Sequence, residues 1–286
     1  MKKYTIKNSI VRLAGMAFVL GASTSAAIAQ QQIPSKVDIA WNRFYDFDES
    51  EKIIKDLVKA YPELLTLRSL GKSEQGRDMW MVILNNPETD EDTEKPAMYI
   101  DGNVHGNEIQ ATETVLYSIW YLTKSYGEVD QLTELIDRTA FYFVPSINPD
   151  GRAEWFANPN TPHSARTGQR PTDNDYDGEL DEDGYEDLDG DGHITQMWKF
   201  DPNGRWRRNK LDPRIIERVP EGEQGELTRL GSEGIDNDGD GRINEDGPGG
   251  YDMNRNWASD WQPNHVQYGA GDHPFDRPET KAVADF

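Results

Sequence analysis

Apolar residues recur along the first half of this chain with two periods, one typical of helices and one typical of strands. Two stretches with apolar residues at helical spacing predict α-helices, at residues 48–60 and 108–124. Shorter apolar runs predict four strands, at residues 64–70, 78–84, 97–100 and 140–147. Because the strands alternate with helices, the pattern predicts an α/β fold with a mixed, largely parallel sheet flanked by helices.

The second half of the chain departs from this pattern. The last predicted strand ends in Asn148-Pro149-Asp150-Gly151, which is a strong turn signal. From about residue 157 to 250 the sequence becomes acidic and rich in Gly and Pro, which predicts an insertion into the fold. Three segments of this insertion follow the pattern D-x-D-x-D-G, at residues 173–178, 187–192 and 236–241. The first and third belong to an internal repeat, Asp173–Gly184 and Asp236–Gly247.

The D-x-D-x-D-G spacing places carboxylates where an EF-hand calcium loop has its first, third and fifth ligands. The twelfth position, a Glu in EF-hands, is Gly184, Trp198 or Gly247 here, so complete EF-hands are not expected. A looser calcium loop and a solvated acidic linker both remain compatible with this composition. The candidate calcium ligands are Asp173, Asp175, Asp177, Asp187, Asp189, Asp191, Asp236, Asp238 and Asp240.

The N-terminus has the pattern of an export signal. Four basic residues precede a short apolar run at residues 13–22, and Ala27-Ile28-Ala29 resembles a cleavage site. Residues 1–29 are therefore predicted to be a signal peptide, with an uncleaved anchor as the alternative, and the protein is expected to be secreted or periplasmic. The apolar run is too short to span a bilayer permanently, so no stable membrane insertion is expected.

Charge narrows the range of partners. The formal net charge of the 286 residues is -22, which argues against nucleic acid as a partner and suits divalent cations. The chain has no cysteine, so disulfides cannot stabilise it even outside the cell. No oligomeric state is predicted.

One short motif carries candidate chemistry. His105-Gly106-Asn107-Glu108 follows the predicted strand at 97–100 and has the form H-x-x-E. Hydrolytic zinc is commonly held by two His and one Glu, and glycines allow the tight turn that such a pair needs. Taken alone, the motif is also compatible with a surface salt bridge.

Six ordered segments make the chain resemble the M14 zinc carboxypeptidase family. They are Tyr61–Leu64 with Gly71–Arg77 (G-x-S-x-x-G-R), Tyr99–Glu108 (the zinc signature), Val144–Gly151 (N-P-D-G), Trp206–Asn209 (W-R-x-N), Tyr251–Trp257 (D-x-N-R-N-W) and Pro278–Thr280 (P-E-T). Asp276-Arg277 stands where the family usually has Ser-Glu before P-E-T.

The resemblance implies roles for five residues. His105 and Glu108 correspond to zinc ligands, and Arg207 corresponds to the arginine that polarises the scissile carbonyl. Asn254 and Arg255 correspond to the pair that binds the free carboxylate at the substrate's C-terminus. Arg207 could instead be one of several solvated arginines, and Asn254-Arg255 could be a turn before a packing residue.

The resemblance also implies that the family's third ligand, a His, and its catalytic Glu follow the P-E-T segment. The sequence ends at Phe286, inside an expected helix, so residues 30–286 are expected to be the N-terminal portion of the catalytic domain and inactive by themselves. The expected function of the whole protein is removal of C-terminal residues from peptides or proteins by zinc-activated water. The alternatives are a catalytically inactive relative that binds calcium or peptides, and an exported calcium-binding adhesion protein.

Overall fold

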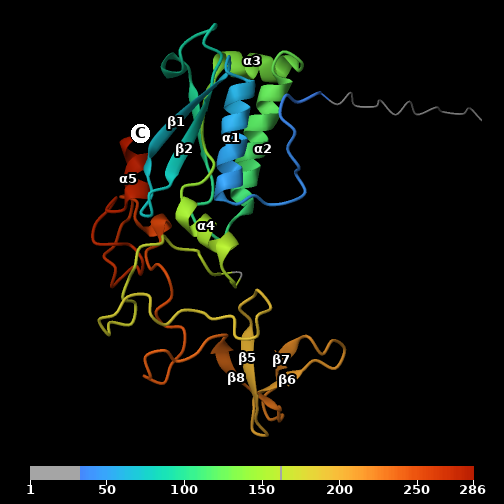
Figure 1. The fold of residues 1–286 in the computed structure, drawn as a ribbon, viewed down its shortest axis with the longest axis vertical. Coiled ribbons are helices and arrows are strands. Elements are labelled where there is room, and N and C mark those ends of the chain that lie inside the picture. The colour runs from blue at the N-terminus through green and yellow to red at the C-terminus, as the bar shows by residue number, and fades with distance from the viewer. Residues whose placement is uncertain (1–32, 162) are drawn as a thin grey trace, which may run out of the picture. The chain divides into compact units, whose positions relative to one another are not determined.

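The structure, a computed structural model, describes residues 33–161 and 163–286. The predicted signal peptide at residues 1–29 lies outside these residues. Four strands form the first sheet, in the order β1-β2-β4-β3 (Figure 1). Their bounds are Leu65–Lys72 (β1), Asp78–Leu84 (β2), Ala97–Asp101 (β3) and Ala140–Val144 (β4). All four strands were predicted from the sequence, with boundaries that differ by a few residues.

The strand directions in this sheet are mixed, as expected. β1 and β2 form an antiparallel hairpin, β2 and β4 are also antiparallel, and only β3 and β4 are parallel. The parallel share is therefore smaller than expected among the described strands. The physical reason is connectivity, because a short turn can join only antiparallel neighbours, whereas the parallel pair needs a helical crossover.

Helices form this crossover and cover the sheet. α1 (Phe47–Ala60) begins with a capping box between Asp46 and Glu49, which satisfies free N–H groups at its first turn. α2 (Gln110–Ser125) and α3 (Asp130–Arg138) connect β3 to β4. α1 and α2 agree with the predicted helices, whereas α3 was not predicted.

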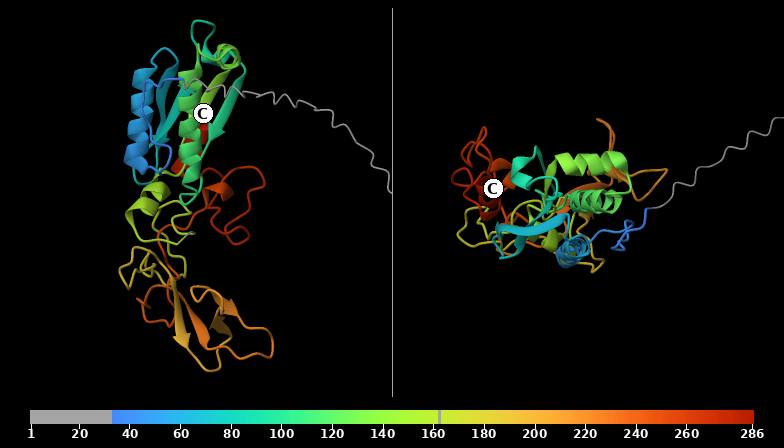
Figure 2. Two further views of the ribbon diagram at one scale, coloured as in Figure 1. Left: turned by 90° about the vertical axis from the view of Figure 1, so that its right-hand side faces the viewer. Right: turned by 90° about the horizontal axis from the view of Figure 1, so that it is seen from above.

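Two buried clusters lie on opposite faces of the sheet, because side chains alternate along a strand. On one side, Val82 and Leu84 of β2 pack with residues of α1 and α2. On the other side, Met79 and Met81 pack in a cluster that includes partly buried residues of α5 (Pro278–Asp285). Figure 2 shows α1 and α2 beside the sheet and α5 behind it. β2, one of the two central strands, is thus covered on both faces, as its nearly continuous apolar sequence requires.

The N-P-D-G segment is the start of a helix, so interpreting it only as a turn was incomplete. α4 (Pro149–Ala157) begins there, and the side chain of Asn148 accepts a hydrogen bond from the Gly151 N–H. Asn is a favoured N-cap, and Pro is favoured at the first helical position because its missing N–H would be unpaired anyway. The turn residues therefore serve as a helix start.

The acidic insertion contains a second sheet that was not predicted. Its order is β5-β8-β6-β7, and every pairing between these strands is antiparallel. The bounds are Gln196–Phe200 (β5), Trp206–Arg208 (β6), Ile216–Arg218 (β7) and Leu227–Ser232 (β8). Two tryptophans, Trp198 and Trp206, pack edge to face with ring centroids 5.3 Å apart. In the part of the chain that the structure describes, no helix has the length and apolar character needed to cross a membrane.

Candidate metal centre

The H-x-x-E motif lies in a tight turn between β3 and α2, and a buried amide holds this turn. Asn103 has a positive φ of 56° and donates from its side chain to the carbonyls of His105 and Gly106, at 2.7 and 3.1 Å. Its side-chain oxygen accepts a hydrogen bond from Ser146, just beyond β4. The turn is therefore fixed by a neighbouring strand end and does not depend on the two motif side chains.

Gly106 allows another segment to approach this turn closely. A Cβ at this position would lie 2.1 Å from the carbonyl oxygen of Ala165, which only a glycine avoids. The Gly106 N–H donates to the carbonyl of Arg166 at 3.1 Å. The side chain of Asn148 also donates to the carbonyls of Arg166 and Thr167. Backbone contacts thus place Arg166 beside the H-x-x-E turn.

The two motif side chains face each other. His105 is buried, and its Nδ1 lies 3.0 Å from Oε1 of Glu108, whose side chain is 49% exposed. On the other side of the ring, Nε2 lies 3.1 Å from Oδ1 of Asp252. A carboxylate can only accept, so a neutral ring donates either from Nε2 to Asp252 or from Nδ1 to Glu108. The tautomer with its proton on Nε2 is the one that leaves the Nδ1 lone pair facing the same space as the Glu108 carboxylate.

This donor set fits zinc. Zinc sites combine imidazole nitrogen with carboxylate oxygen, and a ligating His almost always donates its other N–H to a carboxylate or carbonyl. His105 and Glu108 are residues of these two ligand types, and Asp252 lies where a ring bound through Nδ1 would donate its Nε2–H. Sequence analysis identified the first two residues but not Asp252, which lies 147 positions after His105.

Asp252 also connects His105 to the segment predicted to bind substrate. Its Oδ1 accepts a hydrogen bond from the Asn254 N–H at 2.8 Å, at the start of the short helix η2 (Met253–Arg255). Asn254 is exposed, and the Arg255 guanidinium donates to the Asn254 carbonyl at 3.1 Å. The structure therefore brings Asn254 and Arg255 to the edge of the site that contains His105.

Arg166 brings a positive charge to this site, and sequence analysis did not identify it. Its Nη2 lies 3.0 Å from Nε2 of His105, and its guanidinium forms ion pairs with Glu108 at 3.6 Å and Asp252 at 3.7 Å. The Arg166 side chain is 39% exposed, so it can also reach a bound molecule. The available signal was an arginine soon after N-P-D-G, at the start of the insertion.

Arg207 lies elsewhere, in β6 of the second sheet. Its Nε donates to Glu217 at 2.9 Å and its Nη1 donates to Glu223 at 2.7 Å. These two carboxylates raise the pKa of Arg207 and compensate its charge. Among the described residues, no hydrogen bond or ion pair joins Arg207 to His105, Glu108 or Asp252.

Hydrogen bonds join other segments of the family resemblance to one another. Asp150 of N-P-D-G is buried and accepts hydrogen bonds from Ser73 and Arg77 of the G-x-S-x-x-G-R turn, at 2.7 and 2.8 Å. Glu279 of P-E-T is buried and accepts from the Tyr251 hydroxyl at 3.0 Å. Burial raises the pKa of Glu279. Segments that are far apart in the sequence thus form one connected network.

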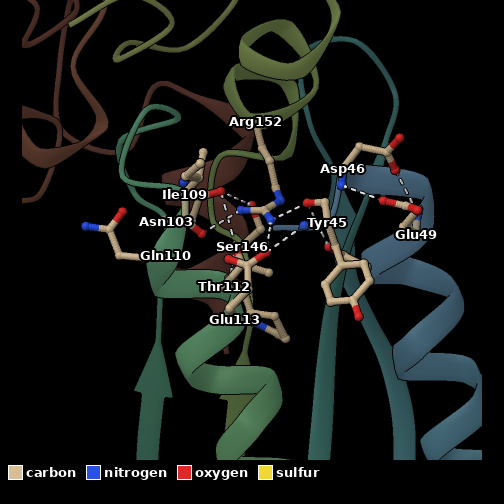
Figure 3. Close-up of polar contacts among 12 residues, drawn as sticks. Tyr45, Asp46, Glu49, Asn103, Ile109, Gln110, Thr112, Glu113, Ser146 and Arg152 are labelled. Atoms are coloured by element: carbon tan, nitrogen blue, oxygen red, sulfur yellow. Dashed lines mark hydrogen bonds and ion pairs between the residues drawn. The ribbon is translucent and has the colours of Figure 1, made fainter. Parts of the chain in front are cut away.

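A buried arginine, Arg152, holds the N-terminal end of α2 in place (Figure 3). Arg152 of α4 is fully buried, donates to the Ile109 carbonyl at 2.8 Å and also donates to the Tyr45 carbonyl. Its Nη2 forms an ion pair with Glu113 of α2 at 2.6 Å, and Glu113 also accepts from the Tyr45 N–H. Burial lowers the pKa of Arg152, which Glu113 partly offsets. Arg152 thereby fixes the residue that follows Glu108.

Known proteins of one family resemble this chain in sequence. The family model described as zinc carboxypeptidase matches residues 50–286. Carboxypeptidase D of Rattus norvegicus is 30% identical over 145 residues, which cover 51% of this chain and 10% of that protein. Carboxypeptidase M of Mus musculus is 32% identical over 38% of this chain and 25% of its own length. A zinc carboxypeptidase of Saccharothrix mutabilis subsp. capreolus is 32% identical over 45% of this chain and 28% of its own length.

Solved structures share the fold. The thrombin activatable fibrinolysis inhibitor matches 86% of this chain and 44% of its own, with a TM-score of 0.53 and 18% identity. Carboxypeptidase A from Helicoverpa armigera matches 87% and 43%, with a TM-score of 0.52 and 18% identity. The chain spans about a tenth of the carboxypeptidase D relatives and less than half of these two structures.

Proposed function

Since this chain belongs to the zinc carboxypeptidase family, we propose that the intact gene product is an exported metallocarboxypeptidase that removes C-terminal residues from peptides or proteins. The observation that carries the proposal is the pairing of His105 Nδ1 with Glu108 at 3.0 Å while Nε2 faces Asp252. Export rests on the N-terminal sequence pattern alone.

His105 and Glu108 would hold the zinc ion, as two of the three protein ligands typical of hydrolytic sites. Bound zinc supplies a Lewis acid that lowers the pKa of a coordinated water. Asp252 keeps the proton of His105 on Nε2 and fixes the ring plane, so that Nδ1 presents its lone pair. Asp252 is thus a positioning residue in this proposal.

The Asp252→Asn variant tests this role. It removes the charge that accepts the ring N–H but keeps an oxygen for the Asn254 N–H, so zinc affinity should fall about 10–100-fold with the fold intact. Zinc affinity is measured by competition with a chromophoric chelator, and circular dichroism checks the fold. Wild-type affinity in Asp252→Asn would contradict the positioning role.

Arg166 is the better candidate for stabilising the charge that develops on the scissile carbonyl oxygen. Its guanidinium already lies beside His105, Glu108 and Asp252, and its side chain is partly exposed. Arg207 is held by two glutamates of the second sheet. A permanently charged fork of fixed donors suits this task.

Asn254 and Arg255 would bind the free carboxylate of the substrate. A bidentate contact between arginine and carboxylate selects chain ends over internal peptide bonds. Support comes from Asp252, which ties this segment to His105 through its hydrogen bond to the Asn254 N–H.

The function is tested by hydrolysis of matched peptides with free or amidated C-termini by the intact gene product, with and without a zinc chelator. We expect turnover of the free peptide only, abolished by the chelator and restored by zinc. Equal turnover of both peptides, or no effect of the chelator, would remove the proposal.

We further propose that the acidic loops of the insertion bind calcium. Candidate ligand atoms lie within 4.8 Å of one another in two single-loop groups: Asp187, Asp189 and Asp191, and Asp236, Asp238 and Asp240. In these two loops and at residues 173–178, the first Asp accepts hydrogen bonds from at least two N–H groups of its own loop. The three loops therefore share one backbone shape, which turns their carboxylates to a common side.

A further inference from the structure

The two halves of the internal repeat pair with each other. Asp183, at position 11 of the repeat Asp173–Gly184, forms an antiparallel bridge with Asp246, at position 11 of the repeat Asp236–Gly247. The Asp246 N–H donates to the Asp183 carbonyl at 3.1 Å. Equivalent positions thus meet, as they do around a local two-fold axis.

The side chains at position 11 cross to the opposite repeat. The fully buried carboxylate of Asp246 accepts hydrogen bonds from the N–H groups of Asn174 and Asp181 in the first repeat, at 2.8 and 3.0 Å. The fully buried carboxylate of Asp183 accepts from the Asn237 side chain and the Asn244 N–H in the second repeat, at 3.1 and 3.0 Å. Each carboxylate oxygen retains a lone pair for a cation.

The glutamates at position 10 are partly exposed, but their carboxylate oxygens are buried. Both carboxylate oxygens of Glu182 and both of Glu245 are buried, and no group among residues 33–161 and 163–286 donates a hydrogen bond to any of them. Their neighbours are instead other carboxylates, Asp246 beside Glu182 and Asp183 beside Glu245. A bound cation would compensate carboxylates that lack donors and face like charges.

Ligand atoms from the two repeats gather in shared groups. Asp175, Asp177 and Glu182 of the first repeat lie with Asp238 of the second, within 4.8 Å of one another. Asp173 and Asp175 form a second group with Asp246 at the same spacing. The first loop is therefore completed by side chains from the other repeat, which replace the missing position-12 ligand of an EF-hand.

We propose that the repeats form one paired calcium unit, in which each ion is held by positions 1, 3, 5 and 10 of one repeat and by position 11 of the other. This rests on the calcium binding proposed above and adds the ligands Glu182, Glu245, Asp183 and Asp246. All-oxygen, carboxylate-rich and irregular coordination favours calcium over magnesium, which demands near-octahedral geometry and retains water.

The loop at residues 187–192 lacks this arrangement. The buried glutamate beside it, Glu233, accepts hydrogen bonds from the N–H groups of Leu188, Asp189 and Thr195, so its carboxylate is satisfied by donors. These bonds lower the pKa of Glu233. The paired repeats therefore differ from the third loop in their need for a cation.

The test uses terbium(III) as a calcium probe in the intact gene product. Tyr176 lies within the first loop, whereas the second repeat has Gly239 at the same position, so tyrosine-sensitised terbium emission distinguishes the first repeat from the second. We expect Asp246→Asn, a change in the second repeat, to weaken terbium binding at the first repeat about tenfold or more. Calcium should displace terbium from the wild-type protein.

Two further variants make the test decisive. Glu182→Gln should weaken terbium binding in the same way, and Glu179→Gln, an exposed change in the same loop, should leave it unchanged. If Asp175→Asn abolishes binding while folded Asp246→Asn and Glu182→Gln match the wild type, the loops bind calcium singly and the paired unit is refuted. If the wild type shows neither terbium emission nor calcium binding by calorimetry, both calcium proposals fail.

Discussion

Replacing Arg166 by alanine is expected to lower kcat for C-terminal peptide hydrolysis about 10²–10³-fold, with a small change in KM. The guanidinium lies 3.0 Å from His105 Nε2 and forms ion pairs with Glu108 and Asp252, so it is in place to meet charge that develops at the reacting carbonyl. An interaction made mainly in the transition state affects kcat more than substrate binding. Steady-state kinetics on the intact gene product measure both constants.

Arg207→Ala is the matched control. Its guanidinium pairs with Glu217 and Glu223 in the second sheet, so its removal should leave kcat within about twofold of the wild type. Arg166→Lys should restore part of the loss, because a point charge remains while the planar fork is absent. A large loss in Arg207→Ala together with wild-type kcat in Arg166→Ala would contradict the assignment.

Replacing Arg152 by alanine is expected to destabilise the fold by about 3–5 kcal/mol. The change leaves Glu113 largely buried without its cation and removes the donor to the carbonyls of Ile109 and Tyr45. Because Ile109 directly follows Glu108, loss of this anchor should also loosen the turn that holds the proposed metal ligands His105 and Glu108. Urea unfolding followed by circular dichroism measures the change.

Arg138→Ala provides a surface comparison. Arg138 pairs with Glu134 one helical turn away, and its side chain is 75% exposed, so its loss should cost about 0.5 kcal/mol or less. Equal unfolding midpoints for the Arg152 and Arg138 variants would show that Arg152 does not anchor the fold as described.

Local patterns predicted the parts of the fold that depend on local physics. α1, α2 and the four strands of the first sheet follow from the spacing of apolar residues, because each buries one face or both faces against a neighbour. The strands of the second sheet have only three to six residues each and lie between acidic and Gly-rich loops, so their periodicity is too short to identify.

The candidate site was likewise predictable only where it depends on residues that are close together in the sequence. His105 and Glu108 are three residues apart, so one turn brings them together, and their sequence shows it. Arg166 and Asp252 reach His105 only through tertiary contacts, such as the hydrogen bond from the Gly106 N–H to the Arg166 carbonyl. The W-R-x-N motif therefore indicated Arg207. Arg166, in contrast, lies beside His105 because of contacts between segments that are far apart in the sequence.

The proposed cation ligands of the paired repeats show the same limit. Positions 1, 3 and 5 of each loop are visible in the sequence as D-x-D-x-D-G. Glu182 and Asp246, in contrast, belong to different repeats, and 52 positions separate the end of the first repeat (Gly184) from the start of the second (Asp236). The two repeats pair through the bridge between Asp183 and Asp246. Spacing within one loop cannot predict ligands supplied by another.

Zinc content of the intact gene product tests the central claim most directly. After exhaustive dialysis, atomic absorption should find about one zinc per chain in the wild type and in Arg207→Ala, and little or none in His105→Ala or Glu108→Gln. Circular dichroism and unfolding midpoints establish that the variants are folded. Zinc retained at the wild-type level by a folded His105→Ala variant would contradict the account.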